Sequence, residues 1–357
     1  MASSEILTFS APQVQAAQVE AMPSPTLELA YAYYFLNRKD SAQRVGELPW
    51  LAVLYGKHKS LVESIKTFWP EDGRGGEFKG DILLVAVCAL GYARDADTKR
   101  LLEEFGGLPG RVVEYLEWAR SETLAYLDRH GKDSHRKDYQ GMIECFLMLG
   151  EPERGRRFLS SLKRLWKVLE PMWNEEGRAQ AERASREFMA KYRETGDVLR
   201  ALPTHHFTQF EGDSQAIRKS LENNKLLAVP LFFASSGGFN FDFTGAHYIG
   251  YGIQSERFFE TLSARVGAAA GRIKAVADPT RLMLLTLIAR YDGFDMTVSD
   301  FASQLGVTQP TVSGHLKLLK EADLVTLEKR GNKAIYKLNT PALEEAIGEF
   351  QALILKK

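Results

Sequence analysis

The chain has 357 residues, which is too many for one small domain and predicts two or three. Hydrophobic residues make up 45% of it, as in globular proteins, and no apolar run is long enough to cross a membrane. The formal net charge of zero argues against a uniformly basic nucleic-acid binder, but residues 264–357 carry 13 Lys and Arg against 10 Asp and Glu.

The chain contains two cysteines, Cys88 and Cys145, both within apolar runs. We expect reduced core thiols rather than a disulfide, as is usual in the cytoplasm. The N-terminus lacks the basic-then-apolar order of a signal peptide, so we expect a cytoplasmic protein without a membrane partner.

Residues 1–25 are rich in Ser, Ala, Gln and Pro and predict a flexible arm. Thr26 then caps an apolar, aromatic helix over 27–36, whose side chains line either a buried core or a ligand pocket. The core is the more common role of such a helix and is our prediction.

Residues 26–200 predict a helical domain. The helices expected after the first one cover 49–55, 59–69, 80–92, 97–104, 111–130, 134–149 and 153–191, the last interrupted near Pro171. The glycine-rich stretch 72–76 lacks the Lys-Ser/Thr and the strand of a phosphate loop, which indicates an ordinary turn.

Residues 201–255 predict a β-rich connecting segment with strands over 226–233, 239–243 and 246–253, forming a small antiparallel sheet. His205, His206 and His247 are candidates for a metal or acid–base site there. Adjacent strand residues point to opposite faces, so only one of His205 and His206 could join His247, and a structural role is favoured.

Residues 256–357 predict a third domain, entered by a helix over 255–276. Thr297 is an expected N-cap with Asp300 as its capping partner, and Gly306 is expected to end that helix. Thr308 is a second N-cap, followed by Pro310 in the first turn of a helix from Gln309 to Ala322.

The second of these helices has a buried face formed by Val312, Leu316 and Leu319, at intervals of three or four residues. The remaining surface is polar and lightly basic and begins at a helix N-terminus, as a recognition helix in the major groove requires. The residues expected to contact double-stranded DNA from this helix are Thr308, Gln309, Thr311, Ser313, His315 and Lys317.

A hairpin follows, with strands over 324–327 and 334–338. Its turn contains Gly331, and its tip is basic. A basic hairpin after a recognition helix indicates a wing that contacts flanking phosphates. The residues expected to do so are Lys329, Arg330, Asn332 and Lys333.

These segments, together with the run AVADPTRL at 275–282, resemble the winged helix–turn–helix of ArsR-type transcriptional repressors over about 263–357. The sequence departs from the family pattern in two places. Gly314 stands where the family often has Arg, which removes a DNA contact, and Asp323 stands where a Gly is usual. Asp tolerates a left-handed conformation, so the fold is preserved.

The resemblance implies a homodimer that reads two half-sites through helices flanking the DNA-binding core. Leu343, Ile347, Phe350 and Ile354 form an apolar stripe in the last helix and are the expected dimer interface. The alternative is that this stripe packs against its own chain.

Many ArsR-type proteins sense metals through cysteines on the first helix of the motif, but 296–301 holds neither Cys nor His. We therefore expect no metal ion of that kind, and the absence of catalytic motifs predicts no cofactor and no catalytic residue. The expectation is a mainly α (α+β) DNA-binding regulator, most simply a repressor, whose N-terminal region binds a small-molecule effector or a partner. The alternatives are an enzyme, or a protein–protein interaction module, carrying a regulatory winged helix.

Overall fold

The computed structural model describes residues 19–46, 48–76, 78–130, 136–203, 225–235, 237–243, 245–291, 294–331 and 333–354. The chain divides into two compact units, Met1–Phe258 and Phe259–Lys357, which are treated separately here. No helix within the described ranges is long and apolar enough to cross a membrane. The fold is mainly helical with small sheets, which confirms the expected class.

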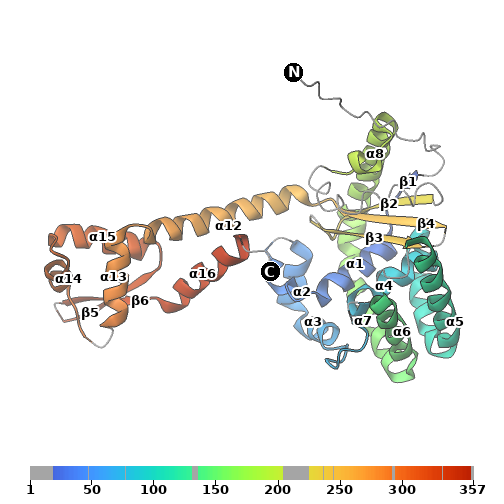
Figure 1. Cartoon of the computed structure of the whole chain (residues 1–357), viewed down its shortest axis with the longest axis horizontal. Coiled ribbons are helices and arrows are strands. Elements are labelled where there is room, and N and C mark those ends of the chain that lie inside the picture. The colour runs from blue at the N-terminus through green and yellow to red at the C-terminus, as the bar shows by residue number, and fades with distance from the viewer. Residues whose placement is uncertain are drawn as a thin grey trace, which may run out of the picture. The chain divides into compact units, whose positions relative to one another are not determined.

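The N-terminal unit contains a group of helices and one sheet (Figure 1). Its strands are β1 (Val19–Ala21), β2 (Lys225–Leu231), β3 (Gly238–Phe243) and β4 (Ala246–Gly252). Its helices and helical turns are α1 (Pro25–Asn37), η2 (Ser41–Arg44), α2 (Pro49–Lys57), α3 (Lys59–Lys66), α4 (Phe78–Ala89), η3 (Tyr92–Arg94), α5 (Lys99–His130), α6 (Arg136–Gly150), α7 (Pro152–Met172), η4 (Trp173–Gly177), α8 (Arg178–Thr195) and α9 (Val198–Ala201).

Helix α1 lies in the centre of this unit. Ser24 caps it by accepting a hydrogen bond from the Leu27 N–H (3.2 Å), and Pro25 occupies the first turn, where a missing N–H leaves no bond unmade. Ten consecutive residues, 27–36, are buried except for the half-buried Tyr34, and α1 packs against the equally buried α4. This confirms the prediction of a core helix.

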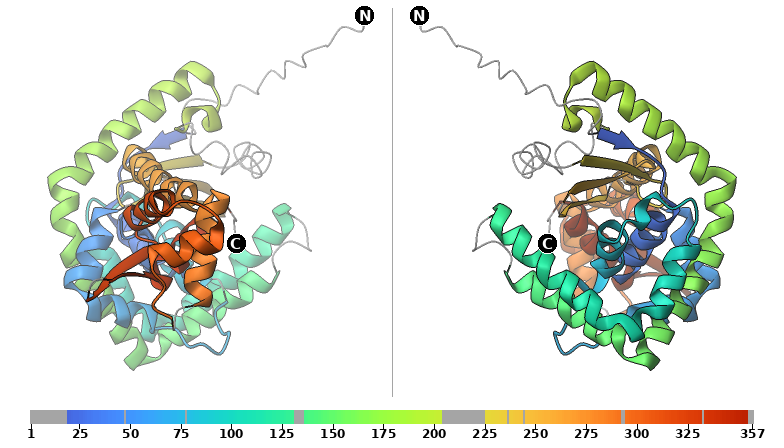
Figure 2. Two further views of the ribbon diagram at one scale, coloured as in Figure 1. Left: turned by 90° about the vertical axis from the view of Figure 1, so that its left-hand side faces the viewer. Right: turned by 90° about the vertical axis from the view of Figure 1, so that its right-hand side faces the viewer.

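The expected helices over 97–104 and 111–130 are joined in α5, with a kink at Arg111 (φ −123°, ψ 15°) two residues after Pro109. Helices α5 and α6 lie side by side (Figure 2). The interruption expected near Pro171 is a π-helical turn, η4, between α7 and α8. Pro171 lacks the N–H that would continue the α-helical ladder, which is consistent with a local change of helix type there.

The sheet has the strand order β1-β2-β4-β3. Only β3 and β4 are antiparallel; β2 runs parallel to both β1 and β4, with Leu227 opposite Glu20 on one side and Tyr248 on the other. The prediction of an antiparallel sheet was therefore right for β3 with β4 and wrong for β2 with β4, and the pairing of β1 with β2 was not predicted. Strand β4 enters between β2 and β3, and residues 19–21 of the expected arm supply the fourth strand. No local pattern in the sequence predicts this strand order, because it depends on pairing between segments that are far apart in the chain.

The two faces of the sheet pack against different helices. Leu227, Val229 and Leu231 alternate toward the large helical core, as period-2 strand geometry requires. Leu226 and Ala228 face a smaller cluster with Phe188 of α8. The sheet is therefore a buried middle layer, which positions the loops at its edges.

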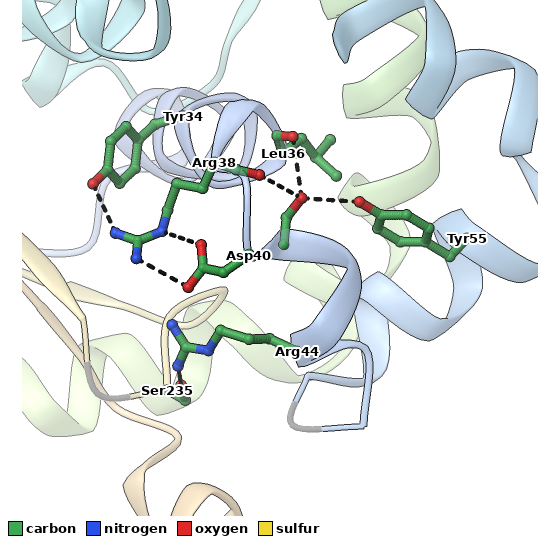
Figure 3. A network of polar contacts seen from close by, with 8 residues as sticks. Tyr34, Leu36, Arg38, Asp40, Arg44, Tyr55 and Ser235 are labelled. Carbon is green, nitrogen blue, oxygen red and sulfur yellow. Dashed lines mark hydrogen bonds and ion pairs between the residues drawn. The ribbon is translucent and has the colours of Figure 1, made fainter. Parts of the chain in front are cut away.

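Polar contacts gather around the end of α1 and η2, and one of them is a hydrogen bond from η2 to the loop after β2 (Figure 3). Arg38 donates to both carboxylate oxygens of Asp40 (2.9 and 3.1 Å) and to the Tyr34 hydroxyl (3.2 Å). Arg44 donates to the Ser235 hydroxyl (3.1 Å), and its guanidinium lies 5.1 Å from the centre of the Phe35 ring. The bond between Arg44 and Ser235 joins residues 191 positions apart in the sequence.

The C-terminal unit is a helix–turn–helix followed by a hairpin and a last helix. Its elements are α12 (Ser255–Val276, which begins just before the unit boundary), α13 (Pro279–Arg290), α14 (Val298–Leu305), α15 (Gln309–Glu321), β5 (Val325–Arg330), β6 (Lys333–Leu338) and α16 (Thr340–Ile354). Leu284 of α13, Phe301 of α14 and Leu316 of α15 meet in one buried core, which fixes the angle between the helices.

Candidate nucleic-acid interface

The start of α14 has the expected capping box. The Thr297 hydroxyl oxygen accepts from the Asp300 N–H (3.4 Å), and Asp300 accepts from the Thr297 N–H (2.8 Å) and hydroxyl (2.7 Å). The hydrogen bond from the Thr297 N–H holds the pKa of Asp300 below its usual value. Gly306 ends the helix with φ +65°, in the left-handed region that glycine adopts without strain.

Helix α15 begins as predicted. Thr308 caps it by accepting from the Thr311 N–H (3.4 Å), and the two hydroxyl groups are 2.8 Å apart. Val312, Leu316 and Leu319 are fully buried, and they turn the opposite face of the helix outward. Asp323 follows the helix with φ +59°, the left-handed conformation expected for it.

The candidate residues on α15 do not all share one environment. Those that are exposed are Thr308, Gln309, Thr311, Ser313 and Lys317. Gln309 donates to the Ser299 hydroxyl of α14 (3.1 Å), so it also joins the two helices of the motif. His315 is half-buried, with its Nδ1 3.8 Å from a carboxylate oxygen of Asp278, at the N-terminus of α13. His315 thus faces the inside of the motif, and the other five form the exposed surface.

Gly314 lies on this exposed surface between Ser313 and His315. A Cβ atom added to it meets no other atom within 4 Å. Nothing in the fold requires glycine here, and the open space would accept a long side chain.

The wing is longer than predicted, because β5 and β6 extend to Arg330 and Lys333, which are paired with each other. The turn is correspondingly short and includes Gly331 with φ +59°. Asn332 lies outside the described residues. Lys329 and Lys333 are exposed, and neither forms an ion pair with the described part of the chain.

Arg330 is held by two acidic residues. Its Nη1 is 2.7 Å from Asp295 Oδ1, and its Nε is 3.0 Å from Glu328 Oε1. The hydrogen bond from the Arg330 guanidinium keeps the pKa of Glu328 below its usual value, and a hydrogen bond from Lys337 lowers it further. Glu328 stands two residues before Arg330 and therefore on the same face of the strand, a period-2 spacing that is visible in the sequence. Asp295 lies 35 residues before Arg330, and no pattern in the sequence indicates that the two side chains form an ion pair.

The last helix, α16, pairs with α12 through Arg265–Glu349 (2.7 Å) and Arg272–Glu345 (3.6 Å). Its predicted apolar stripe is largely exposed: Leu343 is half-buried, but Ile347 (53%), Phe350 (42%) and Ile354 (61%) are not. Leu343, Ile347 and Phe350 line a groove of about 560 Å³ together with Ile273 and Leu282, which are themselves exposed.

Of the three histidine candidates in the N-terminal unit, His247 alone lies in the described part of the chain. His247 is buried and its Nε2 is 2.5 Å from Asn240 Oδ1, with Asp242 3.8 Å from Nδ1. His205 and His206 lie outside the described residues. Across the described ranges no group of three or more metal-ligating side chains occurs. Cys88 and Cys145 are buried free thiols, and burial raises the pKa of Cys145 to about 12.

Comparison with known proteins finds similarity in the C-terminal unit. The family model described as bacterial regulatory protein, arsR family, matches residues 278–326. The transcriptional repressor SdpR of Bacillus subtilis is 38% identical over 74 residues, covering 21% of this chain and 79% of that protein. The regulator CmtR of Mycobacterium tuberculosis is 35% identical over 95 residues, covering 27% of this chain and 78% of its own.

A third relative is the arsenical resistance operon repressor of Staphylococcus xylosus, which is 36% identical over 72 residues, covering 20% of this chain and 66% of its own. All three relatives match about a quarter of the chain or less, in agreement with the extent of the resemblance seen in the sequence. Most of the N-terminal unit lies outside these matches. Through its C-terminal unit, the chain belongs to the ArsR family of bacterial regulatory proteins, which are DNA-binding transcriptional regulators.

Proposed function

We propose that this protein is a sequence-specific transcriptional repressor that reads the major groove with α15 and contacts flanking phosphates with the β5–β6 wing. The observation that carries the proposal is the exposed, uncharged polar surface at the N-terminus of α15, set on a fully buried apolar face. Gln309 and Ser313 offer short donors and acceptors to base edges there. Lys317, Lys329 and Lys333 add positive charge for phosphates.

The repressor acts as a homodimer. The exposed stripe of Ile347, Phe350 and Ile354 continues into the groove bordered by Ile273 and Leu282, an apolar surface of the kind that a second copy covers. Two recognition helices then read two half-sites of a symmetric operator.

The N-terminal unit supplies the regulatory input. Since α14 carries no cysteine or histidine, the metal-sensing position of many ArsR-type proteins has no thiolate or imidazole ligand here. An effector in the N-terminal unit would instead change the spacing of the two recognition helices, and so relieve or strengthen promoter occlusion.

The test is selection of genomic fragments by the purified protein at two salt concentrations. The proposal expects a two-fold symmetric site whose binding weakens steeply as salt rises. Recovery of no preferred sequence, or binding that hardly responds to salt, would overturn it in favour of a protein-binding role.

Two variants refine the assignment. Gln309→Ala should relax sequence preference at one position of each half-site without changing the salt dependence. The double variant Ile347→Asp, Phe350→Asp should give a monomer by analytical ultracentrifugation. Gly348→Asp adds charge at an exposed position of the same helix outside the stripe and should leave the dimer intact. If the double variant stayed dimeric, the interface would lie elsewhere.

A further inference from the structure

The N-terminal unit contains a cavity of about 160 Å³ at the carboxyl ends of β2 and β4. Phe232 directly follows β2, Gln254 lies two residues after β4, and both line the cavity. Because these strands are parallel, their carboxyl ends lie at the same edge, where open sheets with such strands commonly bind ligands. A cavity of roughly 150 Å³ accommodates benzene, so the space suits a ligand of that size.

One wall of this cavity is held by long-range hydrogen bonds. The carboxyl oxygens of the buried Glu28 accept from the N–H groups of Phe232 (2.5 Å) and Phe233 (3.0 Å). Trp50, which also lines the cavity, donates from Nε1 to the Phe233 carbonyl oxygen (2.9 Å). Contacts between residues more than 180 positions apart thus hold the backbone at Phe232 and Phe233 and the ring of Trp50, so the tertiary fold itself forms this wall of the cavity.

The opposite wall is the π-helical turn η4 with the residue before it, Met172. The turn ends at the buried Gly177, where an added Cβ would lie 2.7 Å from Trp173 Cε3 and 2.8 Å from Phe232 Cδ1. Glycine therefore allows the turn to approach Phe232 closely. Single π-helical turns occur frequently at functional sites, and this one carries two exposed carboxylates at the cavity, Glu175 and Glu176.

Acceptors outnumber donors among the polar side chains of the lining, because the two carboxylates only accept and the Gln254 amide has one N–H besides the one that bonds to Gln180. Gln254 is 8% exposed and donates from Nε2 to Gln180 Oε1 (3.0 Å). Its own Oε1 has no hydrogen-bond partner among the described residues. The lining contains no Lys, Arg or His, and the Trp50 N–H is already engaged. A ligand that satisfies these groups must bring donors and positive charge, and aromatic rings favour a cation as well.

We propose that this cavity binds a small organic amine in its ammonium form, with an apolar body about the size of a benzene ring. The ammonium group lies near Glu175, Glu176 and Gln254 Oε1, and the apolar body packs against Trp50, Met172 and Phe232. Gln254 immediately precedes Ser255, the first residue of α12, which continues into the winged unit. The ligand's role as the effector rests on the proposed function, but its binding does not.

The test uses benzylamine, benzyl alcohol and benzoate, which share a ring and differ in charge. Each is titrated into the full-length protein and followed by calorimetry and tryptophan fluorescence. Benzylamine should bind roughly five- to tenfold more tightly than benzyl alcohol, the gain expected from two partly exposed ion pairs, and benzoate should bind most weakly. Equal binding of all three, or no binding of benzylamine at millimolar concentration, would overturn the proposal.

Variants locate the site. Glu175→Gln with Glu176→Gln should bring benzylamine down to the affinity of benzyl alcohol, while Glu182→Gln, at an exposed position of α8, should change nothing. Both changes are on the surface, and an unaltered urea midpoint verifies folding. Met172→Trp should fill the cavity and weaken both ligands. A double variant that keeps the preference for benzylamine would refute the site.

Operator binding in the presence of benzylamine separates the two proposals. Amine binding that leaves operator affinity unchanged would refute the effector role and retain the site. Failure of the protein to select any DNA would refute the proposed repressor function. The amine-binding measurements would still test the cavity independently.

Discussion

The two units of this protein are organised by interactions of very different range. In the winged unit the caps of α14 and α15 and the turns at Gly306 and Asp323 are settled within a few residues of sequence. In the N-terminal unit the decisive bonds link Glu28 to Phe232 and Trp50 to Phe233, across 204 and 183 residues. The structure of the winged unit can be predicted from local sequence patterns, whereas that of the N-terminal unit depends on long-range contacts that form only in the folded chain.

Glu28→Ala should have the largest effect, a loss of unfolding free energy of the N-terminal unit measured near pH 6. One buried and one part-buried N–H group lose their acceptor, and each such loss costs about 1–3 kcal/mol, so the N-terminal unit should lose about 2–6 kcal/mol. All five tryptophans precede residue 174, so their fluorescence in a urea titration reports that unit alone. Glu63→Ala, on the exposed face of α3, is the control. An unchanged midpoint would show that Glu28 does not hold the wall.

A pH titration tests the same residue. Burial raises the pKa of Glu28 from 4.5 to about 8, opposed by the hydrogen bonds from Phe233 and Phe232. The neutral form is thus favoured in the folded state, and its stabilising effect is complete below pH 4.5 and is lost as pH rises through about 8. Relative to Glu28→Gln, the wild type should lose a few kcal/mol of unfolding free energy between pH 5 and 9, at about 1.4 kcal/mol per pKa unit. Parallel curves for the two proteins would contradict this assignment.

In the winged unit, Arg330→Ala should weaken binding to all DNA sequences and lower the slope of log affinity against log salt by about 0.9, the value of one phosphate contact. Glu328→Gln should act in the opposite direction, because it frees Arg330 from one of its two acidic partners. Arg290→Ala, at the exposed end of α13, removes an equal charge and serves as the control. If the salt slope stays the same in Arg330→Ala, the wing does not contact the backbone through this residue.

The smallest expected effect comes from Gly314→Arg. The exposed position has room for the side chain, so the variant should gain at most one phosphate contact, and its affinity should rise several-fold with a change in salt slope of less than about 0.9. Gly314→Gln has a similar helix propensity without the charge and isolates the electrostatic part. Equal affinities for the two variants would place residue 314 away from the DNA.

The sequence was sufficient to predict the helices of the winged unit because each cap and each buried face depends on residues within one or two helical turns. Thr297 and Asp300 bond to each other, and Val312, Leu316 and Leu319 share a face through helix periodicity alone. It was insufficient where a partner comes from elsewhere: His315 turns toward Asp278, and Arg330 is held by Asp295, 35 residues away. These tertiary contacts divide the candidate DNA-binding residues into accessible and engaged groups.

The N-terminal unit shows the same limit at the level of topology. The helices were predictable from apolar runs, and α4 is as buried as its composition indicated. The parallel pairing of β2 with β1 and β4 was not, since β1 has only three residues and lies near the opposite end of the unit's sequence. The cavity at the carboxyl ends of β2 and β4 follows from that pairing and was therefore invisible to sequence analysis.

Strand β1 also bears on how this protein can be shortened for study. It covers one edge of β2 through pairing at Leu226, Leu227 and Ala228. A truncated chain beginning at Ser24 would keep every helix of the unit but leave the N–H and C=O groups of that edge without their neighbour. Such an edge recruits strands from other molecules. Shortened versions should therefore retain residues 19–21, and a version without them is expected to self-associate through β2.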